Sequence, residues 1–267
     1  MFSRITLKSR AKMVLSLHYW PTFLIVFLTN AISSFASIIL LPTIPAMNTP
    51  VIEPGNVAVF GLSFVLTMIL SLMLQVFVGT PLNVGLRRFL LDSSTENKAD
   101  ISTLFYGFKN GYKSIAIAGL MKSLIILLYS LLPIAVSLLS PLLLILFEDA
   151  AWLSGTYAII TLLLTYITLI PMISKTYEYY LVEYLLAENP EMHWRDALQK
   201  SAWLMHGNRW FAFKLDLSFI GWILLGALAC GIGVMFVEPY VYQTQAQLYL
   251  ELSGKNEPET ESYTVEL

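Results

Sequence analysis

The sequence predicts an all-α membrane protein, a polytopic bundle of about five transmembrane helices with additional helices on the membrane surface. Three observations lead to this fold class: the composition, the lengths of the charge-free stretches and the distribution of Lys and Arg. Of 267 residues, 57% are hydrophobic and only 13% are charged, and the mean hydropathy is +0.68. A typical soluble domain is about 45–50% apolar and about 25% charged. This chain therefore has too few charged side chains to cover a soluble core.

Composition also excludes several classes of protein. The formal net charge of -2 provides no basic surface for a nucleic acid. A chain this apolar is not intrinsically disordered as a whole. The single cysteine, Cys230, excludes an internal disulfide and a cysteine-based metal cluster.

Five apolar stretches are long enough to cross a bilayer. A hydrocarbon core about 30 Å thick needs roughly 20 residues in a helix, because lipid offers no other partners to backbone groups. The predicted spans are residues 21–41, 57–78, 123–147, 150–174 and 217–237. The third remains open, because Pro133 divides the apolar stretch 115–147. That stretch is either one kinked span or two shorter segments.

The positions of Lys and Arg orient the spans. Short cytoplasmic loops carry an excess of positive charge, and five spans with the amino terminus inside place fifteen of the sixteen Lys and Arg residues on that side. A sixth span would move the group from Lys175 to Lys214 outside. We predict an inner amino terminus and an outer carboxyl terminus. Without a clear cleavage site after the first span, or a lipidation motif, we expect a multi-pass protein of the bacterial cytoplasmic membrane.

Helical periodicity with one apolar face predicts three helices on the inner membrane surface. They cover residues 4–18, 100–112 and 190–206. In the first, Leu7, Ala11 and Leu15 recur at the 3.6-residue period of a helix. Basic amphipathic helices of this kind usually lie flat on an anionic membrane surface.

Capping residues predict where two of these helices begin and end. Asp100 is the expected N-cap of the second helix. In the third, Asn189 is the expected N-cap, Pro190 occupies the first helical position and Gly207 ends the helix. We expect a fourth interfacial helix on the outer surface, over residues 239–252. The polar, acidic tail 253–267 has no apolar periodicity and is predicted to be disordered.

Ionisable residues inside a span would indicate function, because a charge at the centre of a helix costs about 2.5–3.5 kcal/mol on insertion scales. The five-span arrangement places Lys122, Asp216 and Glu238 at membrane edges and leaves the span interiors without an acid, a base or a histidine. This pattern disfavours a proton-coupled transporter and an intramembrane protease. The deep polar residues Asn30 and Gln75 either bridge helices, which is the commoner role, or bind a solute.

Two further groups of residues are candidates for contacts. Small residues four apart in the fifth span allow another helix to approach closely; these are Ala227, Ala229, Gly231 and Gly233. Basic and aromatic residues near the membrane surface are candidates for contact with the inner leaflet; these are Lys8, Arg10, Lys12, Trp20 and Trp210.

Motifs for catalysis or for cofactor binding are missing from the sequence. It contains no HExxH, GxSxG or CxxC motif and no Gly-rich phosphate loop. His193 and His206 are separated by about 220° around a helix, so they could not share a metal ion on one helix. Cys230 lies in an apolar span and is expected to be inert. We predict a protein that is not an enzyme and has no cofactor, metal or catalytic residue.

Runs of residues over most of the chain carry a family resemblance. They include Tyr19-Trp20, Leu104-Phe105, Glu188-Asn189-Pro190, Ser218-Phe219-Ile220-Gly221-Trp222 and Pro239-Tyr240. In these runs the chain resembles a family of bacterial multi-pass membrane proteins, mainly Gram-positive, that is known only as a domain of unknown function. Its layout is also similar to the membrane domain attached to some glycerophosphodiester phosphodiesterases, without their catalytic domain. The resemblance implies a fold and a location but no activity.

Two functions remain open at this stage. The first is a non-enzymatic membrane protein that organises partners or the inner leaflet through helix packing and basic surface helices. The second is a transporter or permease subunit for a neutral or lipid-like solute, suggested by Pro133 and Pro141, which could open a broken helix. The expected partners are membrane lipids and another membrane protein or a second copy of the chain.

Overall fold

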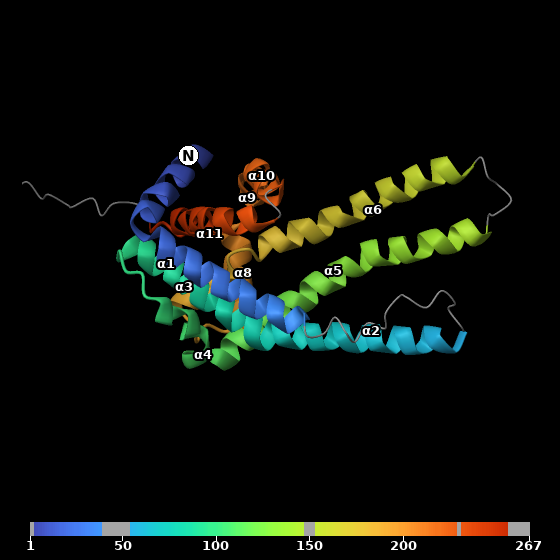
Figure 1. Ribbon diagram of the computed structural model, residues 1–267, viewed down its shortest axis with the longest axis horizontal. Coiled ribbons are helices and arrows are strands. Elements are labelled where there is room, and N and C mark those ends of the chain that lie inside the picture. The colour runs from blue at the N-terminus through green and yellow to red at the C-terminus, as the bar shows by residue number, and fades with distance from the viewer. Residues whose placement is uncertain (1–2, 39–53, 147–152, 229–230, 256–267) are drawn as a thin grey trace, which may run out of the picture.

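The computed structural model describes residues 3–38, 54–146, 153–228 and 231–255, and every regular element in these ranges is a helix. Figure 1 shows a body at one end of the molecule and three arms that extend from it. The arms are the helices α2 (Pro54–Leu74), α5 (Tyr112–Leu146) and α6 (Leu153–Glu178). The all-α fold class predicted from the sequence is confirmed.

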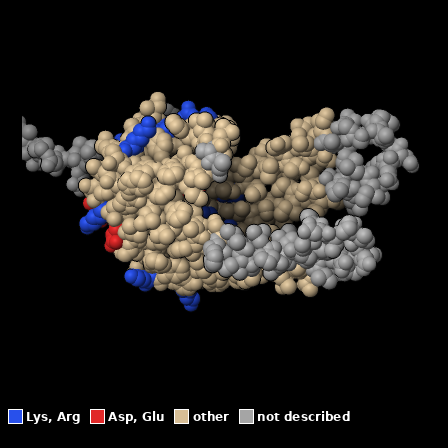
Figure 2. Space-filling model, viewed as in Figure 1, with Lys and Arg blue, Asp and Glu red and all other residues tan. Residues whose placement is uncertain are grey.

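Five helices are long and apolar enough to cross a membrane, as predicted. They lie in the ranges Arg4–Ser34, Val65–Thr95, Tyr112–Leu139, Ile159–Glu188 and Arg209–Leu228. Large apolar side chains are exposed along the arms, among them Leu128, Leu138 and Ile170. In Figure 2 the coloured charged atoms gather over the body, whereas the described surface of the α5–α6 arms is tan. Lipid is the solvent that such a surface requires, so the protein is membrane-inserted.

Helix α1 (Arg4–Ile38) consists of two halves joined at His18, whose φ of -127° and ψ of 29° are not helical. Pro21 contributes to the break because it has no N–H to donate to the carbonyl four residues earlier. The first half corresponds to the predicted surface helix 4–18. Its side chains Leu7 and Ala11 are fully buried against the body.

Helices α2 and α3 (Thr80–Thr95) form one long helix that is interrupted by a π-helical turn, η2 (Gln75–Gly79). Pro81 follows the turn and cannot donate to the carbonyl of Phe77. The hydroxyl of Tyr112 donates to that carbonyl instead, at 3.1 Å. The backbone thus leaves regular α-helical bonding here without losing a hydrogen bond, and π-helical turns of this kind are frequent at functional sites.

Two short elements pack closely on α3. They are the 3-10 helix η3 (Ile101–Phe105) and the helix α4 (Tyr106–Lys109). Asp100 caps η3 by accepting a hydrogen bond from the Ser102 N–H at 2.9 Å, which confirms the predicted N-cap. Gly85 of α3 lies so close to η3 that a Cβ there would be 2.0 Å from the Leu104 carbonyl oxygen.

Helix α5 is continuous from Tyr112 to Leu146. Pro133 therefore does not divide it, and the stretch left open by the sequence forms one long helix. Gly111, with a φ of +59°, joins α4 to α5, a backbone conformation that a residue with a side chain adopts only with strain. Helix α6 packs along α5, as Figure 1 shows.

Helix α7 (Val182–Glu188) and helix α8 (Trp194–Leu204) correct the predicted start of the third surface helix. The N-cap of α8 is His193, whose Nδ1 accepts from the Arg195 N–H at 3.3 Å. Asn189 instead ends α7, because a residue that precedes proline disfavours the α conformation. Gly207, with a φ of +78°, follows α8 and confirms the predicted stop.

Replacing Ser201 by alanine is expected to destabilise the body by about 1–3 kcal/mol. The buried Ser201 hydroxyl donates to the Glu178 carbonyl at 2.9 Å and accepts from the Leu181 N–H at 3.2 Å, so it joins α8 to the α6–α7 junction. Alanine leaves both backbone groups buried without that partner. Unfolding in mild detergent would measure the loss, with the exposed Ser16→Ala as control. Equal stabilities of the two variants would contradict the prediction.

The carboxyl-terminal part of the chain reverses at Gly231, whose φ is +79°. Helices α9 (Arg209–Leu217) and α10 (Ile220–Leu228) precede the reversal, and α11 (Ile232–Leu252) follows it. The predicted fifth span, 217–237, is therefore not one helix, because glycine permits a left-handed turn within it. Figure 1 shows α11 running beside α1.

This reversal places the last helix beside the first. The Arg10 guanidinium lies 2.6 Å from the Glu251 carboxylate, so the start of α1 and the end of α11 are at the same face of the molecule. Residues 4–18 and 239–252 therefore lie at one face of the body. Which side is cytoplasmic stays a prediction, and residues 256–267 of the tail lie outside the described residues.

Candidate functional site

Polar side chains gather at two neighbouring places along the α2–η2–α3 helix. The first is a charged cluster inside the body, formed by Arg87 of α3, Lys122 of α5 and Glu183 of α7. The second is a cavity beside the π-helical turn, between that turn, α1 and α11. Gln75, in the turn, borders the cavity, and it also borders a smaller one next to the charged cluster.

The charged cluster consists of one carboxylate between two cations. Glu183 Oε1 lies 3.0 Å from Lys122 Nζ, and its Oε2 lies 3.3 Å from Arg87 Nε. Only 12% of the Arg87 side chain, 17% of that of Glu183 and 21% of that of Lys122 is exposed. Three helices that are distant in sequence are thus joined by ion pairs with little access to solvent.

Tyrosine rings hold the guanidinium of Arg87 in place. Its centre lies 5.0 Å from the Tyr184 ring and 4.9 Å from the Tyr242 ring, within cation–π distance of both. Arg87 Nη1 also donates to the Tyr184 hydroxyl at 3.4 Å. The Tyr184 ring in turn stacks on Tyr249 of α11, with 5.1 Å between centroids. The charged cluster therefore also ties α11 to α3 and α7.

Asp216 of α9 lies near this cluster and accepts three hydrogen bonds. The donors are the Tyr177 hydroxyl at 3.0 Å, the Tyr180 hydroxyl at 3.1 Å and Gln245 Nε2 at 3.3 Å. The sequence predicts Lys122 and Asp216 as membrane-edge residues without a role in proton transfer. Both contact groups from other helices, which is consistent with a structural role.

A cavity of about 200 Å³ adjoins the charged cluster. Its lining includes Gln75, Thr80, Gly119, Lys122, Ser123 and Glu183. The backbone of Gly119 approaches α3 closely, since a Cβ there would lie 2.5 Å from Thr80 Oγ1. The two charged lining residues are paired with each other, so this small cavity is polar but electrically balanced.

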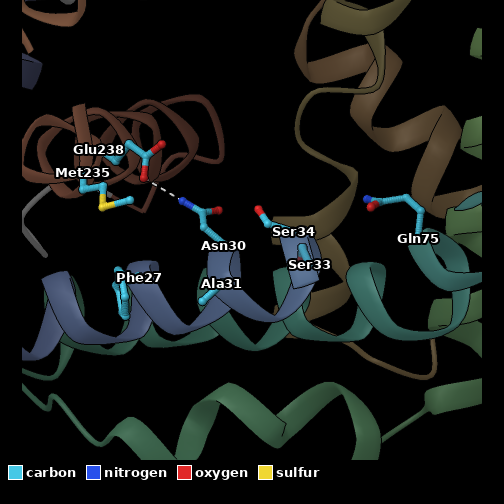
Figure 3. A pocket seen from close by; sticks show the side chains of 8 residues that line it. All are labelled: Phe27, Asn30, Ala31, Ser33, Ser34, Gln75, Met235 and Glu238. Carbon is cyan, nitrogen blue, oxygen red and sulfur yellow. Dashed lines mark hydrogen bonds between the residues drawn. The ribbon is translucent and has the colours of Figure 1, made fainter. Parts of the chain in front are cut away.

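A larger cavity of about 680 Å³ lies between α1, the π-helical turn and α11. Its lining residues are Phe27, Asn30, Ala31, Ser33, Ser34, Gln75, Met235 and Glu238. Figure 3 shows Asn30 and Glu238 pointing toward each other, while Gln75 extends toward the end of α1 where Ser33 and Ser34 lie. The volume lies in the range of sites that bind small molecules.

Glu238 is the charged residue of this larger cavity. Asn30 Nδ2 donates to Glu238 Oε2 at 2.6 Å, so Asn30 bridges two helices, as the sequence predicts for a deep amide. Burial raises the pKa of Glu238, and the Asn30 hydrogen bond partly offsets this rise. Glu238 was predicted to be a membrane-edge residue, and the structure shows that it faces a cavity.

The candidate inner-leaflet residues fall into two groups. The basic residues lie against the protein: Lys8 Nζ is 4.1 Å from the centre of the Phe219 ring, Lys12 Nζ is 5.7 Å from that of Tyr240, and Arg10 pairs with Glu251. The tryptophans are open to the surroundings, with 70% of Trp20 and 63% of Trp210 exposed. Their contact with the headgroup region stays a prediction.

The candidate helix-packing residues also have different roles. Gly233 meets α10 as expected of a small residue, since a Cβ there would lie 2.7 Å from the Gly226 Cα. Its partner, Gly226, is not among the four small residues that the sequence singled out. Gly231 forms the turn instead, Ala227 is exposed, and Ala229 lies outside the described residues.

Sequence reasoning missed Arg87 and Glu183, the centre of the charged cluster. A signal for Glu183 exists, because it is an acid within the apolar run Leu181–Leu186, where every face of a helix would be apolar. Arg87 similarly lies within the run 84–91, of which every residue except Arg87 and Arg88 is apolar or glycine. Charges in such surroundings are usually paired.

Comparisons with known proteins identify a family and add no activity. In the part of the chain that the structure describes, no group of three or more His, Cys, Asp and Glu residues could hold a metal ion. No curated protein and no solved structure matches the chain. One family model matches residues 1–256, nearly the whole chain. The protein therefore belongs to the family described as "Protein of unknown function (DUF975)".

Proposed function

We propose that the protein is a non-enzymatic membrane protein that organises the lipids of the inner leaflet, or a membrane partner, around its helices. The observation that carries this proposal is the apolar surface of the arms and of α10. Leu128 and Leu138 of α5, Ile170 of α6 and Leu228 of α10 are all more than 60% exposed. A surface this apolar requires lipid or another apolar protein against it.

The first half of α1 supports the same proposal, but through its apolar residues and not through its basic ones. Its basic residues contact the protein, but Ile5, Met13 and Leu17 are between 67% and 81% exposed. These residues share one side of the helix, away from the buried Leu7 and Ala11 side. A helix with such an exposed face binds at the boundary between headgroups and acyl chains. We infer that apolar contacts, more than basic ones, attach this helix to the leaflet.

The charged cluster supports a structural role for the body. Each of its charged side chains has an opposite charge within 3.3 Å, and none of them lines the larger cavity. Paired ions of this kind are poor candidates for an acid or base that must exchange protons with a substrate.

In-cell crosslinking followed by purification in mild detergent and mass spectrometry tests this proposal. We expect bound lipids, or a membrane protein in fixed ratio, to co-purify with the chain. The double variant Met13→Gln, Leu17→Gln should reduce this recovery several-fold, while Ser9→Gln, Ser16→Gln, on exposed positions of the same helix, should not. Recovery of the wild-type chain without lipid or partner would contradict the proposal.

A permease subunit is the second candidate, and the larger cavity favours it. The cavity lies beside a π-helical turn and combines amide and hydroxyl groups and the Glu238 carboxylate with Phe27 and Met235, a lining that suits a lipid-like solute with an uncharged or cationic polar head. Vesicles that contain only this protein should then accumulate a labelled neutral solute. Ala31→Trp, which takes up part of the cavity, should reduce the flux strongly. Equal flux in empty vesicles would exclude this function.

A further inference from the structure

The carboxylate of Glu238 has no cationic partner among the described residues. Lys and Arg side chains pair with six other acids in those ranges, but none lies within ion-pair distance of Glu238. Its only hydrogen-bond partner there is the neutral amide of Asn30. A half-buried carboxylate without a counter-charge is costly to keep ionised, so its presence at a cavity calls for an explanation.

The surroundings of Glu238 fit a positively charged group that also donates hydrogen bonds. One carboxylate oxygen accepts from Asn30, and a carboxylate has acceptor capacity beyond that single bond. Ser34 and Gln75 supply further oxygens around the cavity. A primary ammonium has three N–H donors and no acceptor, which matches this set of oxygens.

The remaining walls fit an apolar chain attached to that ammonium. Phe27 and Met235 line the cavity and are themselves 40% and 43% exposed, so the cavity adjoins the outer apolar surface. A hydrocarbon chain can therefore extend from the cavity into surrounding lipid without crossing polar groups. At about 680 Å³ the cavity holds a headgroup and the start of such a chain.

We propose that this cavity binds the primary ammonium head of an amphiphile, with Glu238 as its counter-charge. The ammonium belongs either to a lipid headgroup or to a free long-chain amine. The inference deepens the proposed function, on which it rests, by naming a class of lipid-like ligand for it. A phosphate or carboxylate ligand without an amine is disfavoured, because Glu238 would repel it.

Binding of defined lipids to the purified full-length chain, followed by native mass spectrometry, tests the proposal. The probes are phosphatidylethanolamine, phosphatidylcholine and phosphatidylglycerol with identical acyl chains, together with dodecylammonium. We expect phosphatidylethanolamine to bind at least about tenfold more tightly than phosphatidylcholine, whose methylated nitrogen donates no hydrogen bond. Glu238→Gln should abolish the preference, since it keeps the shape of the side chain and removes its charge.

Controls separate the loss of the site from the loss of the fold. Glu96→Gln makes the same chemical change at an exposed position and should leave the preference unchanged. If Glu238→Gln lowers the melting temperature, Gln75→Leu, which removes one lining amide, should still weaken phosphatidylethanolamine binding several-fold. Dodecylammonium binding that depends on Glu238, without a lipid preference, would assign the site to free amines.

Two outcomes overturn the inference and differ in what they mean for the proposed function. If Glu238→Gln binds phosphatidylethanolamine and dodecylammonium as tightly as the wild type does, with or without a preference among the three lipids, the ammonium site is wrong and lipid organisation stands. If the wild-type chain retains neither lipid nor amine, and no protein partner co-purifies, both proposals fail together.

Discussion

Glu183→Gln is expected to destabilise the folded protein by about 3–5 kcal/mol, which is more than any exposed acid-to-amide change. The carboxylate of Glu183 is the shared partner of Lys122 and Arg87, at 3.0 and 3.3 Å. Glutamine keeps the size of the side chain but leaves two cations close together with no anion between them. Removing one partner of a buried ion pair is costly because the charge that remains is neither hydrated nor paired.

Lys122→Met should cost clearly less than Glu183→Gln. It removes one of the two cations and leaves Arg87 paired with Glu183, so the net charge of the cluster becomes balanced. The aliphatic stem of Lys122 is replaced by a side chain of similar length. Denaturant or thermal unfolding in one detergent would rank the stability losses of these two variants, with the exposed Glu191→Gln as the control. A cost for Lys122→Met that equals or exceeds that of Glu183→Gln would show that charge balance does not hold α3, α5 and α7 together.

The number of candidate spans could be predicted from the sequence because it follows from the lengths of apolar stretches and from the positions of charged residues. The lengths of charge-free stretches and the positions of Lys and Arg are independent of how helices pack. The five candidate spans of the structure confirm that count. Asp100 and Gly207 could be predicted for the same reason, since a cap or a stop is decided by a few neighbouring residues.

The direction in which α11 runs could not be predicted, because it depends on one backbone conformation. A glycine at position 231 is compatible with a helix-packing face that includes Ala227 four residues earlier, and it is equally compatible with a left-handed turn. The spacing alone does not distinguish these two roles. Once the chain turns there, α11 returns along α1 and Arg10 reaches Glu251. The N-cap of α8 was ambiguous in a similar way. Asn189 and His193 both have side chains that can accept a hydrogen bond from the first turn, and the structure uses His193.

The charged cluster and the larger cavity could not be predicted because their members are far apart in sequence. Arg87 and Glu183 are 96 residues apart, and Asn30 and Glu238 are 208 residues apart. Each charged residue, read alone, has an ordinary interpretation as a cytoplasmic or membrane-edge group, and Asn30 has one as a deep amide that bridges helices. Only the packing of α1, α3, α7 and α11 makes them partners, and that packing is set by shape complementarity that no periodicity encodes.

Gly85→Ala is the second substitution for which we expect a large effect, a loss of about 3 kcal/mol or more. In an open helix this change would stabilise by about 1 kcal/mol, because alanine has the higher helix propensity. At Gly85, however, the new Cβ would lie 2.0 Å from the Leu104 carbonyl oxygen and 2.8 Å from that of Thr103. These are backbone atoms, so no side chain can rotate away, and α3 must separate from η3.

Gly221→Ala in α10 is the matched control, since nothing lies within 4 Å of the Cβ added there, and it should be neutral or slightly stabilising. Gly85 is two residues before Arg87, so a displaced α3 also moves that guanidinium away from Glu183. The double variant Gly85→Ala, Glu183→Gln should then cost less than the sum of the two single variants, because the first change already weakens what the second removes. Strict additivity would mean that the contact of α3 with η3 and the charged cluster are independent, and that the position of Arg87 is fixed by its tyrosine neighbours alone.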